Sequence, residues 1–143
     1  MLHLIHPALV HFSVSLLILG GAVEAWALLT RREGPARFGS ILVTCGTISL
    51  LPTIVTGYLA VNTVELTASA ESVLDAHERN GLFLIGLFVG AQFWKGWFRG
   101  ELPRAQRPFY AMLLIAGVLL AAYSALLGGE LVYKLGVGVG VQP

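Results

Sequence analysis

The chain has 143 residues and a mass of 15.3 kDa, which is the size of a single domain spanning residues 1–143. Apolar residues make up 56% of the chain, charged residues only 12%, and the mean hydropathy is +0.78. Soluble domains carry about 25% charged residues, so this composition excludes an ordinary water-soluble fold and indicates a membrane protein. The formal net charge of +1 lacks the basic excess of nucleic-acid-binding proteins, and we expect no nucleic-acid partner.

Four charge-poor segments predict four membrane spans, over residues 8–29, 38–61, 81–98 and 109–129. Each is close to the roughly 20 residues that cross a hydrocarbon layer about 30 Å thick as a helix. A backbone inside lipid must satisfy its own hydrogen bonds, and the runs of adjacent apolar residues lack the alternation of a β-barrel strand. We therefore expect an all-α protein, an integral membrane four-helix bundle with up-down-up-down topology.

Several residues predict where the helices begin and how they pack. Pro7 suits the first helical position of the span 8–29, because its missing N–H has no partner there. Asp75 with Glu78 three positions later resembles a capping box that opens the third helix. Gly86 and Gly90 form a small-x-x-x-small pair on the span 81–98, which is typical of close helix packing in lipid.

Basic residues predict the direction of the spans. Seven of the nine Lys and Arg residues lie in or beside the first and third connections. They are Arg31, Arg32 and Arg37 in the first, and Lys95, Arg99, Arg104 and Arg107 in the third. By the positive-inside rule both connections face the cytoplasm, so the N and C termini should lie on the non-cytoplasmic side.

The histidines His3, His6, His11 and His77 all fall on the predicted outer side. His6 and His11 are five residues apart, so their side chains point about 140° away from each other and cannot serve one centre as neighbours. In an up-down bundle, His11 and His77 would lie at similar depths and could face each other. Two imidazoles opposed in an apolar bundle hold a b-type haem through axial nitrogens, so we predict His11 and His77 as ligands of haem iron.

Other interpretations of these polar residues stay open. The histidines could cap helices or bond to main-chain carbonyls, and His6 with His11 and an outer carboxylate such as Glu78 could hold a metal ion instead. Glu24, the single acid in the span 8–29, could relay protons. It could also reach the interface or bond to Thr44 on the neighbouring helix.

The remaining chemistry-bearing features point to packing. Cys45, the only cysteine, lies in an apolar run without a basic activator, and we expect it in the core. No Ser/His/Asp arrangement is assignable, so we expect no independent catalytic activity. Residues 130–143 form a Gly/Val-rich tail, whose Gly-Val alternation favours an extended segment over the outer end of the bundle.

The chain resembles a bacterial membrane family known as domain of unknown function 2231. The likeness covers nearly the whole chain and is carried by four elements: His6-Pro7-x-x-x-His11-Phe12, Thr56-Gly57, His77, and Gly128-Gly129-Glu130-Leu131-Val132-Tyr133 before Gly136-Val137-Gly138-Val139. By this likeness His6, His11 and His77 occupy the motif positions, and the fold is a four-helix membrane domain. Members often have proline at the position of Ser13 and histidine at that of Leu135, so a centre that relied on that last histidine would be incomplete here.

Taken together, these features favour a small subunit of a membrane electron-transfer complex that binds haem b between the first and third spans. The alternative is a cofactor-free structural or accessory subunit of a larger membrane complex. A permease is less favoured, because four spans offer few intramembrane polar groups. The expected partners are the lipid bilayer and other membrane subunits, in the bacterial inner membrane.

Overall fold

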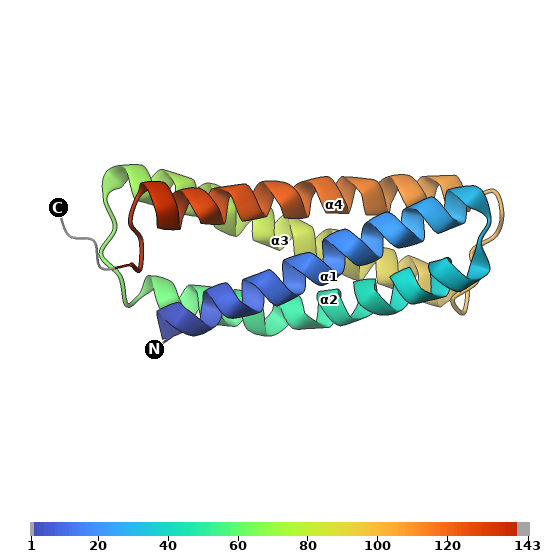
Figure 1. Ribbon diagram of the computed structural model, residues 1–143, viewed down its shortest axis with the longest axis horizontal. Coiled ribbons are helices and arrows are strands. Elements are labelled where there is room, and N and C mark those ends of the chain that lie inside the picture. The colour runs from blue at the N-terminus through green and yellow to red at the C-terminus, as the bar shows by residue number, and fades with distance from the viewer. Residues whose placement is uncertain (1, 140–143) are drawn as a thin grey trace.

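The computed structural model describes residues 2–139, with side chains from Ile5 onward. Its helices are α1 (Leu2–Thr30), α2 (Glu33–Val61), α3 (Ala68–Trp97), α4 (Arg107–Gly129) and the short π-helical segment η1 (Glu130–Lys134). The four long helices run alternately up and down the long axis of the molecule (Figure 1). This arrangement confirms the predicted all-α four-helix bundle with up-down-up-down topology.

Three of the four long helices are apolar enough to cross a membrane. Among the described residues, the segments of sufficient length and hydropathy are Ile5–Thr30, Glu33–Val61 and Arg107–Lys134. Helix α3 is not one of them, because its first half carries four charged side chains, at Glu71, Asp75, Glu78 and Arg79. Its span over residues 81–98 therefore stays a prediction, whereas the other three segments agree with the sequence analysis.

Two helices begin earlier than their sequence signals indicated. Helix α1 starts at Leu2, so Pro7 lies inside the helix and not at its first position. Helix α3 starts at Ala68, and the hydroxyl of its N-cap residue Thr67 accepts a hydrogen bond from the backbone N–H of Ala70 at 3.3 Å. The predicted capping box at Asp75 is thus wrong, because that residue lies two turns into a helix that Thr67 has already capped.

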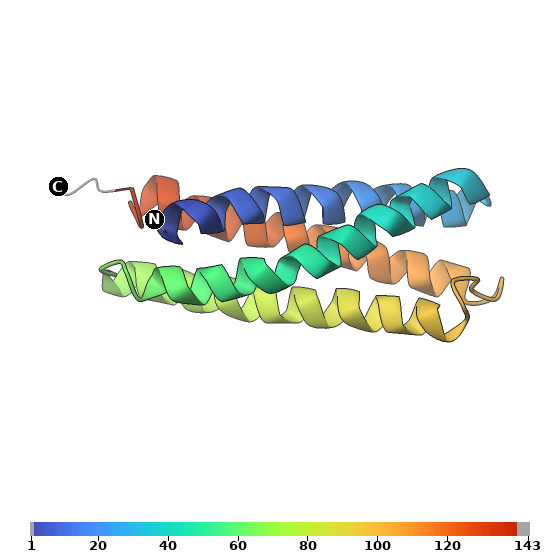
Figure 2. The ribbon, with the colours of Figure 1, turned by 90° about the horizontal axis from the view of Figure 1, so that it is seen from below.

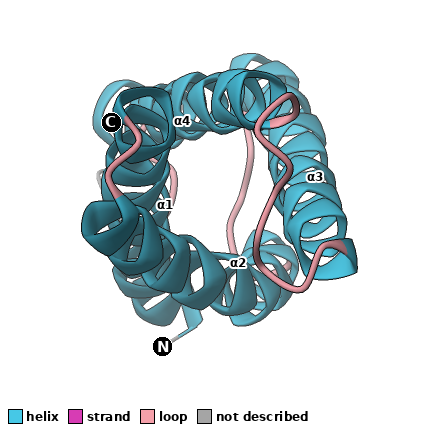
Figure 3. Cartoon of the chain, turned by 90° about the vertical axis from the view of Figure 1, so that its right-hand side faces the viewer, coloured by secondary structure: helices cyan, strands magenta, loops and turns pink. Residues whose placement is uncertain are grey.

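The helices stand at the corners of a square when the bundle is viewed along its axis, with α1 diagonal to α3 (Figure 3). Helices α1 and α2 approach closely at small residues. A Cβ added to Gly39 would lie only 2.5 Å from the backbone nitrogen of Glu24, and one added to Gly46 would lie 2.8 Å from the side chain of Leu17. Contacts of this kind are the usual basis of helix association in lipid.

Helices α2 and α3 pack more loosely. Figure 2 shows α2 running obliquely between α1 and α3. Part of the space that this leaves is a groove of about 700 Å³, lined by residues that include Thr44, Gln92 and Phe93. Gly86 and Gly90 have no atom within 4 Å of an added Cβ, so the expectation that this pair packs against another helix is wrong. Both glycines lie on an exposed face of α3.

The core joins α3 to α4, and the chain then turns back at the end of α4. Phe88 is fully buried, and its ring lies against Gly117, where an added Cβ would come within 2.7 Å of it. After η1 the described residues form turns and no strand, with Gly136 and Gly138 at φ of 69° and 78°. The predicted extended tail is therefore wrong over residues 130–139, because these glycines adopt the left-handed conformation that a turn needs. Gly140 and Val141 lie outside the described residues.

Candidate functional site

We call one end of the bundle the histidine end: it comprises the start of α1, the connection 62–67, the start of α3 and η1. His6 lies there on α1 and faces α2. Its Nδ1–H donates a hydrogen bond to the main-chain carbonyl of Thr53 at 2.9 Å, and the hydroxyl of Thr56 lies 3.4 Å from the same nitrogen. Gly57 makes room for the ring, because a Cβ at this position would lie 2.9 Å from its Cε1 atom.

His77 is held in the same way in the other half of the bundle. It lies on α3, before the charge-free part of that helix, and its Nδ1–H donates to the main-chain carbonyl of Ser124 on α4 at 3.1 Å. A glycine again stands beside the ring: a Cβ at Gly128 would lie 3.4 Å from its Cε1 atom. Burial lowers the pKa of His77 and a positive charge on His6 lowers it further, against the opposing effect of the Ser124 hydrogen bond. The neutral imidazole is therefore favoured.

The imidazoles of His6 and His77 have the same protonation pattern on their two ring nitrogens. A carbonyl can only accept, so each Nδ1 carries the proton and each Nε2 keeps a free lone pair. Neither Nε2 has a hydrogen-bond partner among the described residues. Metal-ligating histidines are typically held by an Nδ1–H bond of this kind, which orients the ring and makes Nε2 more basic. The donor set thus fits axial ligation of haem iron by two neutral imidazoles.

The structure turns His11 away from this pair. Its side chain is exposed, and its Nδ1 bonds to the carbonyl of Pro7 on the same helix at 2.6 Å. The predicted pairing of His11 with His77 therefore finds no support in the geometry, and His6 takes the inward position. Among the side chains described, no group of three His, Cys, Asp or Glu residues could hold a metal ion, so the alternative site of His6, His11 and Glu78 has no support either. The side chain of His3 lies outside the described part.

A second polar cluster lies at the opposite end, which we call the basic end because it contains the two Arg-rich connections, 31–32 and 98–106. Glu24 is fully buried and forms an ion pair with Lys95 of α3, and the same ammonium donates to the hydroxyl of Ser40 on α2 at 2.7 Å. The expectation that Glu24 reaches the interface or bonds to Thr44 is wrong. Thr44 instead accepts a hydrogen bond from Gln92 at 2.9 Å.

The cluster contains two buried oxygen atoms that have no hydrogen-bond partner among the described residues, Glu24 Oε2 and the hydroxyl oxygen of Tyr110. The ammonium of Lys95 lies 5.9 Å from the centre of the Tyr110 ring. Cys45, which we expected in the core, is exposed on α2 toward this end. The cluster ties three helices together across the centre of the bundle.

Sequence reasoning overlooked His6 and Lys95 as partners in these two clusters. For His6 a signal was present. The residues His6, Ser13, Leu17, Gly20 and Glu24 are spaced by seven, four, three and four positions, which places them on one helical face. His11 is not on that face. For Lys95 no local signal exists, because its partner is 71 residues away in the sequence.

Residues 2–141, nearly the whole chain, match a family model described as "Predicted membrane protein (DUF2231)". The chain belongs to this family. The match agrees with the resemblance carried by the histidine and glycine motifs, and it establishes a membrane protein. Neither the curated proteins nor the solved structures contain a match to the chain.

Proposed function

We propose that the protein is a small membrane subunit of an electron-transfer complex and holds haem b between α1 and α3 through His6 and His77. One observation carries the proposal: on two diagonal helices, two half-buried imidazoles each donate Nδ1–H to a main-chain carbonyl and keep Nε2 free. His6 replaces the His11 of the sequence prediction as the ligand from α1. Haem would supply one-electron chemistry when bound, and the chain supplies the ligands and an apolar setting.

The hydrogen bonds of the two histidines explain how the chain would prepare such a site. Thr53 and Ser124 hold the two rings through main-chain carbonyls, so the orientation of each ring depends on helix packing and not on a mobile side chain. Gly57 and Gly128 keep the space beside the rings free of side chains. The neighbouring Asn80 donates to the carbonyl of Leu120 at 3.2 Å, which adds a second polar tie between α3 and α4.

The test is titration of the purified detergent-solubilised protein with haemin, followed by absorption and electron paramagnetic resonance spectroscopy. We expect a sharp Soret band and a low-spin signal typical of two axial imidazoles. His6→Ala and His77→Ala should each remove the low-spin signal, because each removes one ligand. His11→Ala is the matched control, since it removes an exposed histidine from the same helix as His6, and it should leave both spectra unchanged.

Two results would contradict the proposal. One is a wild-type protein that stays colourless although circular dichroism shows it to be folded. The other is a His11→Ala variant that loses haem as completely as His6→Ala. A colourless, folded protein that co-purifies in fixed ratio with larger membrane subunits would instead favour the second candidate, a cofactor-free accessory subunit.

A further inference from the structure

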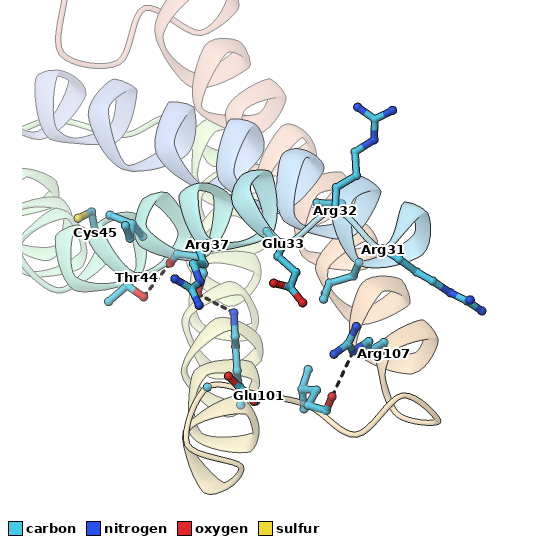
Figure 4. A pocket seen from close by; sticks show the side chains of 16 residues that line it. Arg31, Arg32, Glu33, Arg37, Thr44, Cys45, Glu101 and Arg107 are labelled. Atoms are coloured by element: carbon cyan, nitrogen blue, oxygen red, sulfur yellow. Dashed lines mark hydrogen bonds between the residues drawn. The ribbon is translucent and has the colours of Figure 1, made fainter.

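A pocket lined by charged residues lies at the basic end, at the opposite end of the bundle from the histidines. It has a volume of about 550 Å³ and lies between the two Arg-rich connections (Figure 4). Its lining includes five cationic side chains, from Arg31, Arg32, Arg37, Lys95 and Arg107, and two carboxylates, from Glu33 and Glu101. Lys95 is already paired with Glu24, which lies outside the lining. With Glu24 counted beside Glu33 and Glu101, five cationic side chains still face only three carboxylates.

Two of these arginines are placed to bind an anion. Arg107 donates its Nε–H to the carbonyl of Leu102 at 3.2 Å, which orients the guanidinium and leaves its terminal nitrogens free. Arg37 points into the same pocket, whereas Arg31 and Arg32 point outward (Figure 4). Within the described residues neither Arg37 nor Arg107 forms an ion pair with a carboxylate. A guanidinium with free terminal nitrogens matches the two oxygens of a phosphate group.

The pocket also has an apolar wall that continues along α2. Leu28, Ile41 and Leu102 line it beside the charged groups, and it extends to Cys45. Cys45 is 12 residues beyond Glu33, which is about 18 Å along a helix at 1.5 Å per residue. A basic opening above an apolar wall matches the two parts of a membrane phospholipid, and basic pockets between membrane helices commonly bind lipid headgroups.

We infer that this pocket at the basic end is a binding site for a phosphate group, with Arg37 and Arg107 as the residues that contact it. The apolar wall makes the headgroup of an anionic phospholipid the expected source, and a free phosphate is the other. Glu33 lies between the two arginines in the figure and is exposed (Figure 4), so it can turn away from an arriving anion. The site is independent of haem binding, because no histidine lines it.

The experiment is native mass spectrometry of the full chain in detergent, titrated with phosphatidylglycerol, with phosphatidylcholine, or with inorganic phosphate. Arg37→Gln and Arg107→Gln should each weaken binding of phosphatidylglycerol, or of inorganic phosphate if that is the ligand, roughly ten-fold or more, because each loses a charged hydrogen-bonding partner. Arg104→Gln is the matched control: it removes the same charge three residues before Arg107, outside the pocket lining, and should bind like the wild type. Glu33→Gln should bind more tightly, since it removes a negative charge from the pocket.

Each outcome decides the inference. Preference for phosphatidylglycerol over phosphatidylcholine, lost in Arg37→Gln and Arg107→Gln only, supports the site with a lipid as its source. Binding of inorganic phosphate with the same dependence on the variants, and no lipid preference, supports the site with a soluble source. If Arg104→Gln weakens binding as much as Arg37→Gln, or if the wild type binds neither ligand, the site does not exist. Unchanged circular dichroism of each variant separates lost binding from lost fold.

Discussion

The buried ion pair between Glu24 and Lys95 offers the sharpest test of how this bundle is held together. The carboxylate of Glu24 is 0% exposed, and one of its oxygens already lacks a partner among the described residues. Lys95→Met would leave the other oxygen without its cation while keeping a side chain of similar length. Removing one partner of a buried pair typically costs about 3–5 kcal/mol, because an uncompensated charge stays buried. We expect a loss of that size in the free energy of unfolding.

The same chain contains a matched control. Lys134 pairs with Glu130 at 3.3 Å, but the two side chains are 72% and 37% exposed. Solvent-exposed pairs contribute about 0–1 kcal/mol, so Lys134→Met should have a small effect. Both variants would be unfolded with sodium dodecyl sulfate in mixed micelles, with helix content followed by circular dichroism. The difference between the two losses measures the effect of burial.

A double variant separates the pair from its surroundings. Glu24→Gln combined with Lys95→Met removes both charges, so it should recover most of the stability lost in Lys95→Met alone. If Lys95→Met costs no more than Lys134→Met, the buried ion pair does not stabilise the bundle as described. If the double variant is less stable than Lys95→Met, the charge left on Glu24 is not the cause of the loss.

The remaining predictions concern the histidine end. Gly57→Ala should destabilise the protein by about 1 kcal/mol in thermal unfolding, because the new Cβ would displace the His6 ring from its hydrogen bond. The control is Gly81→Ala, whose new Cβ meets no atom within 4 Å, and it should be neutral or stabilising. For pH, the folded-state pKa of His77 lies below its ordinary value of 6.5, so the unfolded chain binds more protons in acid. Stability should therefore be full above about pH 6.5 and fall as the pH drops through the folded-state pKa. In His77→Gln this dependence should flatten, and an equal slope in both proteins would contradict the assignment.

Much of the fold could be predicted because its signals are local. A helix that crosses lipid needs about 20 apolar residues and must satisfy its backbone within the segment, so the spans can be recognised one at a time. The starts of α1 and α3 were missed for a related reason. Leu2 and Ala68 begin helices in sequence that is not uniformly apolar, and the charge pattern does not separate a helical turn from a connection.

The candidate site could be predicted only in part. Histidine could be recognised as the residue type of the site, because all four histidines fall on the same predicted side of the membrane. The separation of His6 and His11 shows only that both cannot face the interior together, so it does not choose between them. The rotation of α1 decides it, and that rotation follows from close packing at Gly20 and Gly39, where the backbones of α1 and α2 meet.

The amino-acid sequence by itself thus determined a membrane bundle of four antiparallel helices with its basic residues at one end, because burial in lipid acts on each segment separately. The tertiary structure alone decided which polar side chains meet. Glu24 and Lys95 are 71 residues apart, and the hydrogen bonds of His6 and His77 each reach a carbonyl 47 residues away. Such contacts depend on how each helix is rotated and shifted against its neighbours, and packing sets both only when all four helices are in place.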